Sequence, residues 1–324
     1  MGHSPATGKA IVNGYSLTTG WGEGLQSLPA DAHAAAAGCR VLPVPTPVST
    51  DDRLRRATRE CILAVTAVEQ ALANSSMTRN DLAGTRTALI YASTSAYAAA
   101  NWAFLIEDKE KAIYFPYTAP SAVPGEVTIQ FGITGPYLSF LSGANAGIEA
   151  LWHAATLLTN DQCDRALVLG VEKFVECEEL YTSGRWLLGA PLVEVATCLI
   201  LERHTALAEA GYSAGNSHDG IEVMALLPNR QTVTAAYLCL PTARDEHHFA
   251  RQLQKRRPGL PVVELGKRLG NCLACTPLVG LLLAVAERTQ PNVLFVSRWW
   301  DTWAMLHWPI VVGETNPQAI SEVV

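Results

Sequence analysis

The 324-residue sequence has little charge and no concentration of positive charge. Charged residues make up 17% of the chain, and 24 Lys and Arg against 30 Asp and Glu give a formal net charge of -6. The densest basic run, Lys255 to Arg257, is interpreted as a solvated helix end rather than a phosphate site. This composition argues against nucleic acid as a partner.

Long apolar runs are also missing. No apolar stretch is long enough to span a bilayer, and the N-terminus has no secretory apolar region. We therefore expect a soluble, cytoplasmic protein with no membrane partner.

The motifs that mark common cofactor sites are absent as well. No G-x-G-x-x-G follows a strand pattern and no G-x-x-x-x-G-K-[ST] occurs, so nothing indicates a dinucleotide or a nucleoside triphosphate. The eight cysteines lie in apolar segments rather than in a disulfide framework. Cys272 and Cys275 form a lone C-x-x-C without the further ligands that zinc needs. We therefore expect these two residues to pack in the core, and we expect no metal and no cofactor.

Hydrophobic residues, at 49%, are plentiful enough for a large core in one two-lobed domain or in two domains. The organising stretch runs from Gly135 to Leu158. Tyr137 to Leu141 is typical of a short buried strand, and residues 148–158 have apolar side chains at helical spacing. The small-residue turn between them, Ser142 to Gly147, aims a side chain at a helix N-terminus, where backbone N–H groups favour an anion.

Strand patterns alternate with helical patterns along the rest of the chain. This alternation indicates a mainly parallel sheet with helices on both faces. Strands are predicted at 10–14, 87–91, 165–171, 233–240, 261–265, 293–297 and 310–312. Helices are predicted at 54–72, with Asp51 and Asp52 before its start, and at 127–131, 244–254 and 276–286. A further helix is expected to start within 204–210, followed by a polar loop over 213–220.

Three segments resemble β-ketoacyl synthases of the thiolase fold. Residues 135–147, GPYLSFLSGANAG, resemble the nucleophile turn that reads roughly GP–apolar–TACSSG. Residues 165–171, RALVLGV, resemble the strand "VMLAGGTEA" with Glu172 in the acidic position, and residues 186–203 match the next turn and strand, with Glu194 keeping the acidic residue. The resemblance spans residues 10 to 312 and implies an α/β, five-layered αβαβα fold of two similar βαβ halves. The N-terminal half would comprise residues 8–210 and a shortened C-terminal half residues 211–324.

By this resemblance, the residues that perform decarboxylative condensation are replaced. Ala144 stands where a cysteine would accept the acyl chain, and an alanine methyl cannot carry it. Pro241 stands at the first histidine position and Asn271 at the second, so we expect no catalytic residue at these degenerate positions. An asparagine does serve in the His–Asn branch of the superfamily, but an asparagine at a helix start is more often an N-cap, and we favour the N-cap.

The C-terminal Gly-Phe-Gly-Gly loop of ketosynthases is replaced by a tryptophan-rich segment. Residues 298–303 read RWWDTW, and Trp308 follows. Four tryptophans within ten residues indicate either a bulky plug or interface patch, or the edge of a packed core.

The resemblance implies a subunit similar to the chain-length factors of type II polyketide synthases. Such a subunit pairs with an active ketosynthase as a heterodimer, or forms a homodimer, works with an acyl carrier protein and shapes the acyl tunnel. The candidate tunnel or interface side chains are Trp102, Phe104, Tyr114, Phe115 and Phe140, for which ordinary core packing is the alternative. Three other hypotheses stay open: an acyl-thioester enzyme of altered chemistry that uses Asn271, an engineered Cys-to-Ala variant at position 144, and a non-catalytic acyl-binding homodimer. The change at Pro241 argues against the engineered variant.

Overall fold

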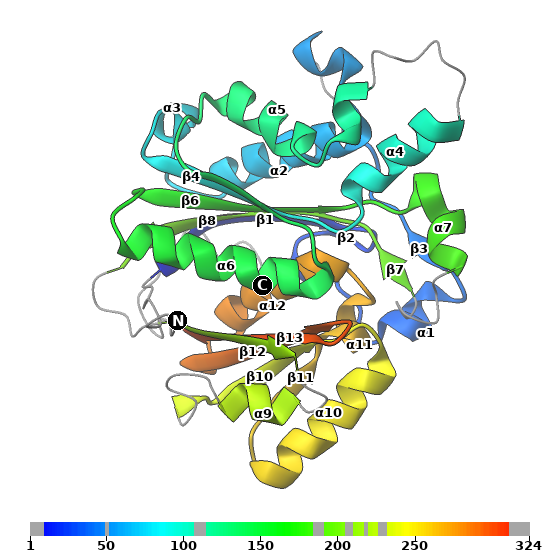
Figure 1. Ribbon diagram of the computed structural model, residues 1–324, viewed down its shortest axis with the longest axis vertical. Helices are drawn as coiled ribbons and strands as arrows, with labels where there is room; N and C mark the ends of the chain where they lie inside the picture. Colours follow the sequence, from blue (N-terminus) through cyan, green and yellow to red (C-terminus); the bar gives the residue numbers. More distant parts are fainter. Residues whose placement is uncertain are drawn as a thin grey trace.

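The computed structural model describes residues 10–48, 52–106, 115–183, 191–204, 210–216, 220–225 and 232–310. Two β-sheets lie one above the other, with helices outside each sheet and a pair of helices between them (Figure 1). The layers are therefore αβαβα, as the sequence predicted. No helix in these ranges is both long enough and apolar enough to cross a membrane.

The first sheet has six strands in the order β2-β1-β8-β6-β4-β5. Their bounds are β1 Ala10–Thr19, β2 Gly22–Glu23, β4 Thr87–Ala92, β5 Tyr137–Phe140, β6 Arg165–Glu172 and β8 Val195–Arg203. β4 runs parallel to β5 and β6, whereas β8 runs antiparallel to β1 and β6. Both β4 and β6 are buried on their two faces, which is why their sequences are continuous apolar runs.

The second sheet has five strands in the order β11-β10-β12-β13-β9. Their bounds are β9 Gly211–Asn216, β10 Ala235–Cys239, β11 Val262–Glu264, β12 Asn292–Trp299 and β13 Thr302–Pro309. β10 is parallel to β11 and β12, and β13 is antiparallel to β12 and β9. A two-stranded sheet joins β3 (Val41–Leu42) to β7 (Leu192–Val193). The first sheet thus uses the chain up to Arg203, and the second sheet uses it from Gly211.

The middle layer consists of α6 (Gly143–Thr159) and α12 (Thr276–Glu287), which lie between the sheets (Figure 1). Both are rich in buried alanine, glycine and leucine, as a helix packed on two sides must be. The outer layers contain α2 (Arg59–Ala73), α3 (Arg79–Leu82) and α5 (Ala122–Phe131) on one side, and α9 (Gly220–Ala225) and α10 (Ala243–Arg256) on the other. The remaining helices are α1 (Ala32–Ala36), α4 (Ala96–Ile106), α7 (Glu178–Ser183), α11 (Leu265–Leu269) and the 3-10 turns η1 (Leu25–Ser27), η2 (Asp52–Arg56), η4 (Val175–Cys177) and η6 (Leu273–Cys275).

The prediction of mainly parallel sheets is wrong, because both sheets are mixed. Residues 211–216, partly assigned to a polar loop, form β9, and residues 302–309 form β13, a strand that the sequence did not predict. Ile310 follows the end of β13, and residues 311 and 312 lie outside the described residues. The hairpin between β12 and β13 turns at Trp300 and Asp301, with Trp300 at a φ of 55°. Tryptophan is not a residue that signals a tight turn, so the sequence pattern did not predict the hairpin.

Three further expectations are corrected by the structure. β5 is an edge strand whose side chains are alternately exposed, not a buried strand, because only β4 pairs with it. α2 begins at Arg59, after a separate 3-10 turn at η2, rather than near residue 54. α5 begins at Ala122 instead of Val127, because Pro124 fits the first turn of a helix, where its missing N–H needs no partner. The helix expected after His204 falls on residues 205–209, outside the described residues.

Candidate functional site

The three degenerate positions lie around one small cavity. Ala144 comes from the first turn of α6, Pro241 from the link between β10 and α10, and Asn271 from the link between α11 and η6. The cavity has a volume of about 10 Å³. This is about the space that one water molecule occupies. The other lining residues are Cys239, Leu240, Leu273, Thr276, Arg298 and Trp299.

Ala144 sits in a helix turn that is packed closely on both sides. Its side chain is 7% exposed. Gly143, just before it, has a φ of 53°, in the left-handed region that favours glycine. A Cβ built on Gly147 would lie 2.2 Å from the carbonyl oxygen of Ala274, so the first turn of α6 contacts the η6 backbone directly. The turn therefore has the small residues that a close approach of backbones requires.

Both ends of the Asn271 amide are engaged with backbone groups. Its Nδ2 donates to the carbonyl oxygen of Pro241 at 3.1 Å, and its Oδ1 accepts from the N–H of Leu273 at 3.0 Å. The Asn271 N–H donates to the carbonyl of Pro191 at 2.8 Å. In this arrangement the side chain orders the start of η6 and ties it to the loop before α10.

Trp299 covers the first turn of α6 from the other sheet. A Cβ built on Gly143 would lie 2.2 Å from the Trp299 Cε3 atom, so the indole rests directly on the Gly143 backbone. Trp299 also packs against a buried cluster that contains Phe174, Leu192 and Leu273. The sequence singled out the tryptophan segment, but the position of Trp299 over Gly143 required the tertiary structure.

Glu172, at the end of β6, binds the backbone of η6, which forms part of the cavity wall. Its carboxylate accepts from the N–H groups of Thr94 at 2.8 Å and Ser95 at 2.9 Å, from the Ser95 hydroxyl, and from the N–H of Ala274 at 3.0 Å. The residue is fully buried, and this burial raises the pKa of Glu172 to about 7 despite the four donors. Glu172 therefore links the end of β4 to η6, which carries part of the cavity wall.

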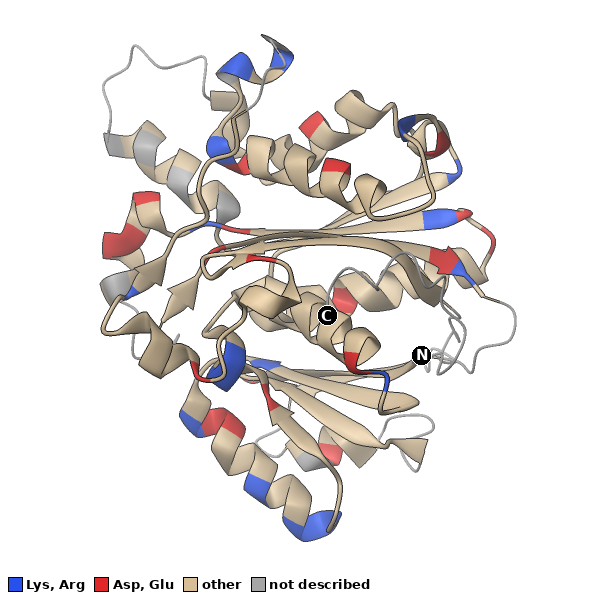
Figure 2. Ribbon diagram, turned by 180° about the vertical axis from the view of Figure 1, so that it is seen from behind, with Lys and Arg blue, Asp and Glu red and all other residues tan. Residues whose placement is uncertain are grey.

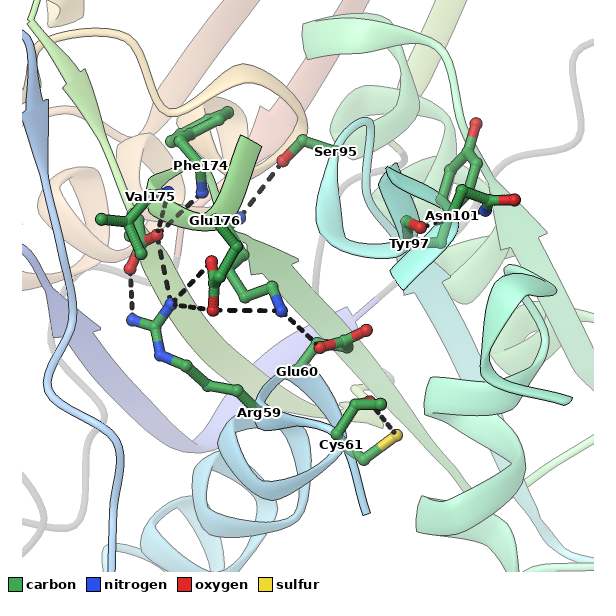
Figure 3. Close-up of polar contacts among 12 residues, drawn as sticks. Arg59, Glu60, Cys61, Ser95, Tyr97, Asn101, Phe174, Val175 and Glu176 are labelled. Atoms are coloured by element: carbon green, nitrogen blue, oxygen red, sulfur yellow. Dashed lines mark hydrogen bonds and ion pairs between the residues drawn. The ribbon is translucent and has the colours of Figure 1, made fainter. Parts of the chain in front are cut away.

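A second acidic residue, Glu194, belongs to a cluster of charges with Arg59, which Figure 3 shows together with Glu60 and Glu176. It accepts from Arg59, from the N–H of Val44 at 2.8 Å and from the N–H groups that follow β6. Burial by itself would raise the pKa of Glu194, but the hydrogen bonds from Arg59 and the backbone bring it below its ordinary value.

Lys173 extends the same cluster. Its Nζ lies 2.7 Å from Glu60 and 3.2 Å from Glu176, and the lysine side chain is almost fully buried. Sequence reasoning identified Glu172 and Glu194 but not Arg59, Glu60 or Lys173, because the partners are far apart in the chain. The signal that could have indicated this cluster is a charged residue within an apolar helix face or at the end of a buried strand.

Comparisons with known proteins show what this chain is similar to. Residues 48–191 match the family model described as β-ketoacyl synthase, N-terminal domain. The AntDE:AntF structure, a type II PKS acyl carrier protein in complex with its ketosynthase, is 15% identical, with a TM-score of 0.73 over 94% of this chain and 100% of that chain. A β-ketoacyl synthase from Burkholderia phymatum STM815 has a TM-score of 0.75 at 14% identity, again over 94% of this chain and 100% of that chain.

The ishigamide ketosynthase/chain length factor is 18% identical, with a TM-score of 0.70 over 94% of this chain and 100% of that chain. The fold of the protein is ketosynthase-like. Its fold is the thiolase fold of these structures. No curated protein matches the chain.

In this ketosynthase-like protein, the predicted tunnel or interface side chains lie away from the small cavity. Trp102 is half-buried on α4, and Phe104 is 39% exposed and contacts Phe115, which is 61% exposed. Phe140 is half-buried on β5 and stacks on His153 with ring centroids 5.0 Å apart. Tyr114 lies outside the described residues. None of the four described aromatic residues lines the cavity at Ala144, and their role in a tunnel or an interface stays a prediction.

Proposed function

We propose that this ketosynthase-like chain is a non-catalytic subunit that pairs with an active β-ketoacyl synthase and shapes the acyl or polyketide tunnel. The observation that carries the proposal is the composition of the small cavity. Ala144, Pro241 and Asn271 stand together there, so these positions offer neither a thiolate nor an imidazole to an acyl thioester. The setting would be type II polyketide biosynthesis or a pathway similar to fatty-acid synthesis.

The open edge of the first sheet supports the pairing. β5 has β4 on one side and no described strand on the other. The Pro136 carbonyl accepts from the N–H of Leu89 in β4, and the Phe140 carbonyl accepts from the N–H of Ser93, just after β4. Because backbone groups of successive residues in a strand point to opposite sides, those of Tyr137 and Ser139 point to the open edge. Tyr137 is 42% exposed and Leu141 is 37% exposed. An unpaired strand with apolar side chains is a surface on which another chain can add a strand.

The solved structures suggest the identity of the partners. One is a ketosynthase/chain length factor, and another is a ketosynthase in complex with an acyl carrier protein. For this chain we propose the same two partners, an active ketosynthase as a heterodimer subunit and an acyl carrier protein that delivers the acyl chain.

A second candidate function is acyl-thioester chemistry by another thiol, because Cys239 lines the same cavity. Its side chain is buried, and burial raises the pKa of Cys239 well above that of a free thiol. The thiolate, which is the nucleophile, is therefore disfavoured. The raised pKa of Cys239 therefore favours the non-catalytic subunit over the enzyme of altered chemistry.

Co-expression and mass spectrometry test the proposal. The full chain is produced alone and together with a tagged, active β-ketoacyl synthase, and both preparations are incubated with a malonyl or an acyl thioester. We expect equimolar co-purification, acylation of the partner and no mass shift on this chain. A homodimer that ignores the ketosynthase overturns the pairing, and an acyl group mapped to Cys239 supports the second candidate instead.

A further inference from the structure

One side chain in the wall of the cavity at Ala144 lies directly on the helix turn that carries this residue. Trp299, at the end of β12, places its six-membered ring on Gly143: built Cβ distances are 2.2 Å to Cε3, 2.4 Å to Cδ2 and 2.8 Å to Cζ3. These three atoms show that the indole lies against the backbone of the helix turn. Any ligand that reaches Ala144 along this side must displace the indole.

Trp299 is held in this place by contacts on several sides. It packs with Phe174 and Leu273, and its ring lies edge-on to Trp300 with centroids 6.3 Å apart. Asn145, the residue after Ala144, is buried and binds the hairpin: its Nδ2 donates to the Thr302 carbonyl at 3.0 Å, and its Oδ1 accepts from the Ser297 hydroxyl. The hairpin and the helix turn are therefore joined on both sides of Trp299, which argues against a freely swinging ring.

We propose that Trp299 is a fixed plug that excludes acyl thioesters from this site, independently of the missing sulfur. The inference rests on the proposed non-catalytic function, since it concerns the same cavity. A space of about 10 Å³ accommodates one water molecule and not a thioester group with its alkyl chain. A thiol restored at position 144 would consequently stay unreactive while Trp299 is in place.

Alkylation by iodoacetamide tests the plug in the full-length protein. Cys39 is the exposed cysteine among the described residues, and it serves as the internal reference for an accessible thiol. In Ala144→Cys, site-resolved mass spectrometry should find residue 144 labelled at least about a hundredfold more slowly than Cys39, because labelling then requires local opening. In Ala144→Cys/Trp299→Ala, we expect labelling of residue 144 to accelerate by about tenfold or more.

The matched control is Ala144→Cys/Trp300→Ala. Trp300 belongs to the same turn and meets Trp299 edge-on, but it is 64% exposed, and the cluster of Phe174, Leu192 and Leu273 still holds Trp299 without it. Its removal should therefore leave residue 144 protected. Labelling of the buried Cys198 reports global unfolding in every variant. If Trp299→Ala unfolds the protein, Trp299→Leu takes its place, since it removes the ring and keeps an apolar side chain.

Three results overturn the proposal. If residue 144 is labelled as fast as Cys39 while Trp299 is present, the site is open. If residue 144 is labelled equally slowly with and without Trp299, another group closes the site. If Trp300→Ala accelerates labelling as much as Trp299→Ala does, the effect belongs to the whole turn. None of these results depends on co-purification with a ketosynthase, so failure of the plug and failure of the pairing are distinguishable.

Discussion

At the scale of single residues, the contact between Gly143 and Trp299 joins α6 of the middle layer to β12 of the second sheet. Gly143 combines a left-handed φ of 53° with an indole against its Cα. A side chain at this position would be strained by the backbone and would also collide with the ring. The glycine is therefore required twice, once for conformation and once for space.

We expect Gly143→Ala to lower the free energy of unfolding by about 2 to 4 kcal/mol, from backbone strain and displacement of the Trp299 ring. Urea unfolding measures the change. Gly125→Ala is the matched control: Gly125 lies in α5, has no left-handed φ, and a Cβ there meets nothing within 4 Å. That substitution should stabilise the helix by about 0.5 to 1 kcal/mol. Equal effects of the two substitutions would contradict the described contact.

Glu172 is the other residue whose chemistry depends on position. Its pKa is about 7 in the folded protein, against an ordinary 4.5. A carboxyl group whose folded pKa is raised binds more protons in the folded than in the unfolded state between these values. Its contribution therefore makes the fold less stable as the pH rises through this window.

Between pH 4.5 and 7, wild-type protein should lose roughly 3 kcal/mol of stability relative to Glu172→Gln, which cannot ionise. The difference between the two unfolding free energies, measured in urea at several pH values, cancels the other titrating groups. Glu194→Gln should show a pH dependence of the opposite sign, because the pKa of Glu194 is lowered in the folded protein. Wild type should lose stability relative to that variant as the pH falls below 4.5. A wild type that gains stability relative to Glu172→Gln as the pH rises would show that the folded pKa is not raised.

At the scale of elements, β5 and the β12–β13 hairpin have different surroundings although both are apolar. β5 ends the first sheet, whereas β12 and β13 lie inside the second sheet with neighbours on both sides. An edge strand has one row of backbone groups available to another chain, and a central strand has none. We therefore propose that β5 carries the pairing and that the hairpin closes the cavity.

Ser139→Pro should abolish co-purification with an active ketosynthase while this chain stays folded. Proline removes the N–H that points to the open edge, and it leaves the hydrogen bonds to β4 intact. Ser139→Ala keeps that N–H and removes only the hydroxyl, which donates to the Tyr137 phenol, so it should still co-purify. Pull-down assays and circular dichroism distinguish lost pairing from lost structure. Full pairing by the proline variant would exclude this edge as the interface.

At the scale of the whole molecule, the two sheets share the middle layer. α6 follows β5 of the first sheet, yet Asn145 binds the hairpin of the second sheet. The Trp21 indole N–H, from the first sheet's hairpin, donates to the Leu269 carbonyl of α11 at 2.9 Å. Because the halves share a core and polar contacts, we expect the chain to unfold as one unit.

Asn145→Ala should lower the free energy of unfolding of the whole chain by about 2 to 3 kcal/mol, because the Thr302 carbonyl loses the Asn145 donor and the buried Ser297 hydroxyl is left with the Ala304 carbonyl at 3.4 Å. Calorimetry should still show a single transition. Asn160→Ala, at the exposed end of α6, should change stability by less than about 0.5 kcal/mol. Two separate transitions in either protein would mean that the halves fold independently.

The sequence by itself determined the strands at Thr87 and Arg165 and the turn at Ala144. These are local patterns or motifs, which can be recognised without knowing which distant segments pack against them. That Ala144, Pro241 and Asn271 are degenerate catalytic positions stays a prediction. Only the tertiary structure decided that β5 is an edge, that the sheets are mixed, and that Asn271 is bonded at both ends. Each of these depends on which distant segment lies alongside, and residue types alone do not specify that.

The same reason applies to Trp299 and Lys173. Tryptophan in a C-terminal segment can lie in a core, at an interface or in a cavity, and the sequence left these possibilities open. Its position over Gly143 follows from a hairpin whose turn places a tryptophan, Trp300, in the left-handed region, and tryptophan does not signal a tight turn. The partners of Lys173 come from α2 and from the residues after β6, and folding brings them together. Residue chemistry was therefore readable from the sequence, while proximity was a property of the folded chain.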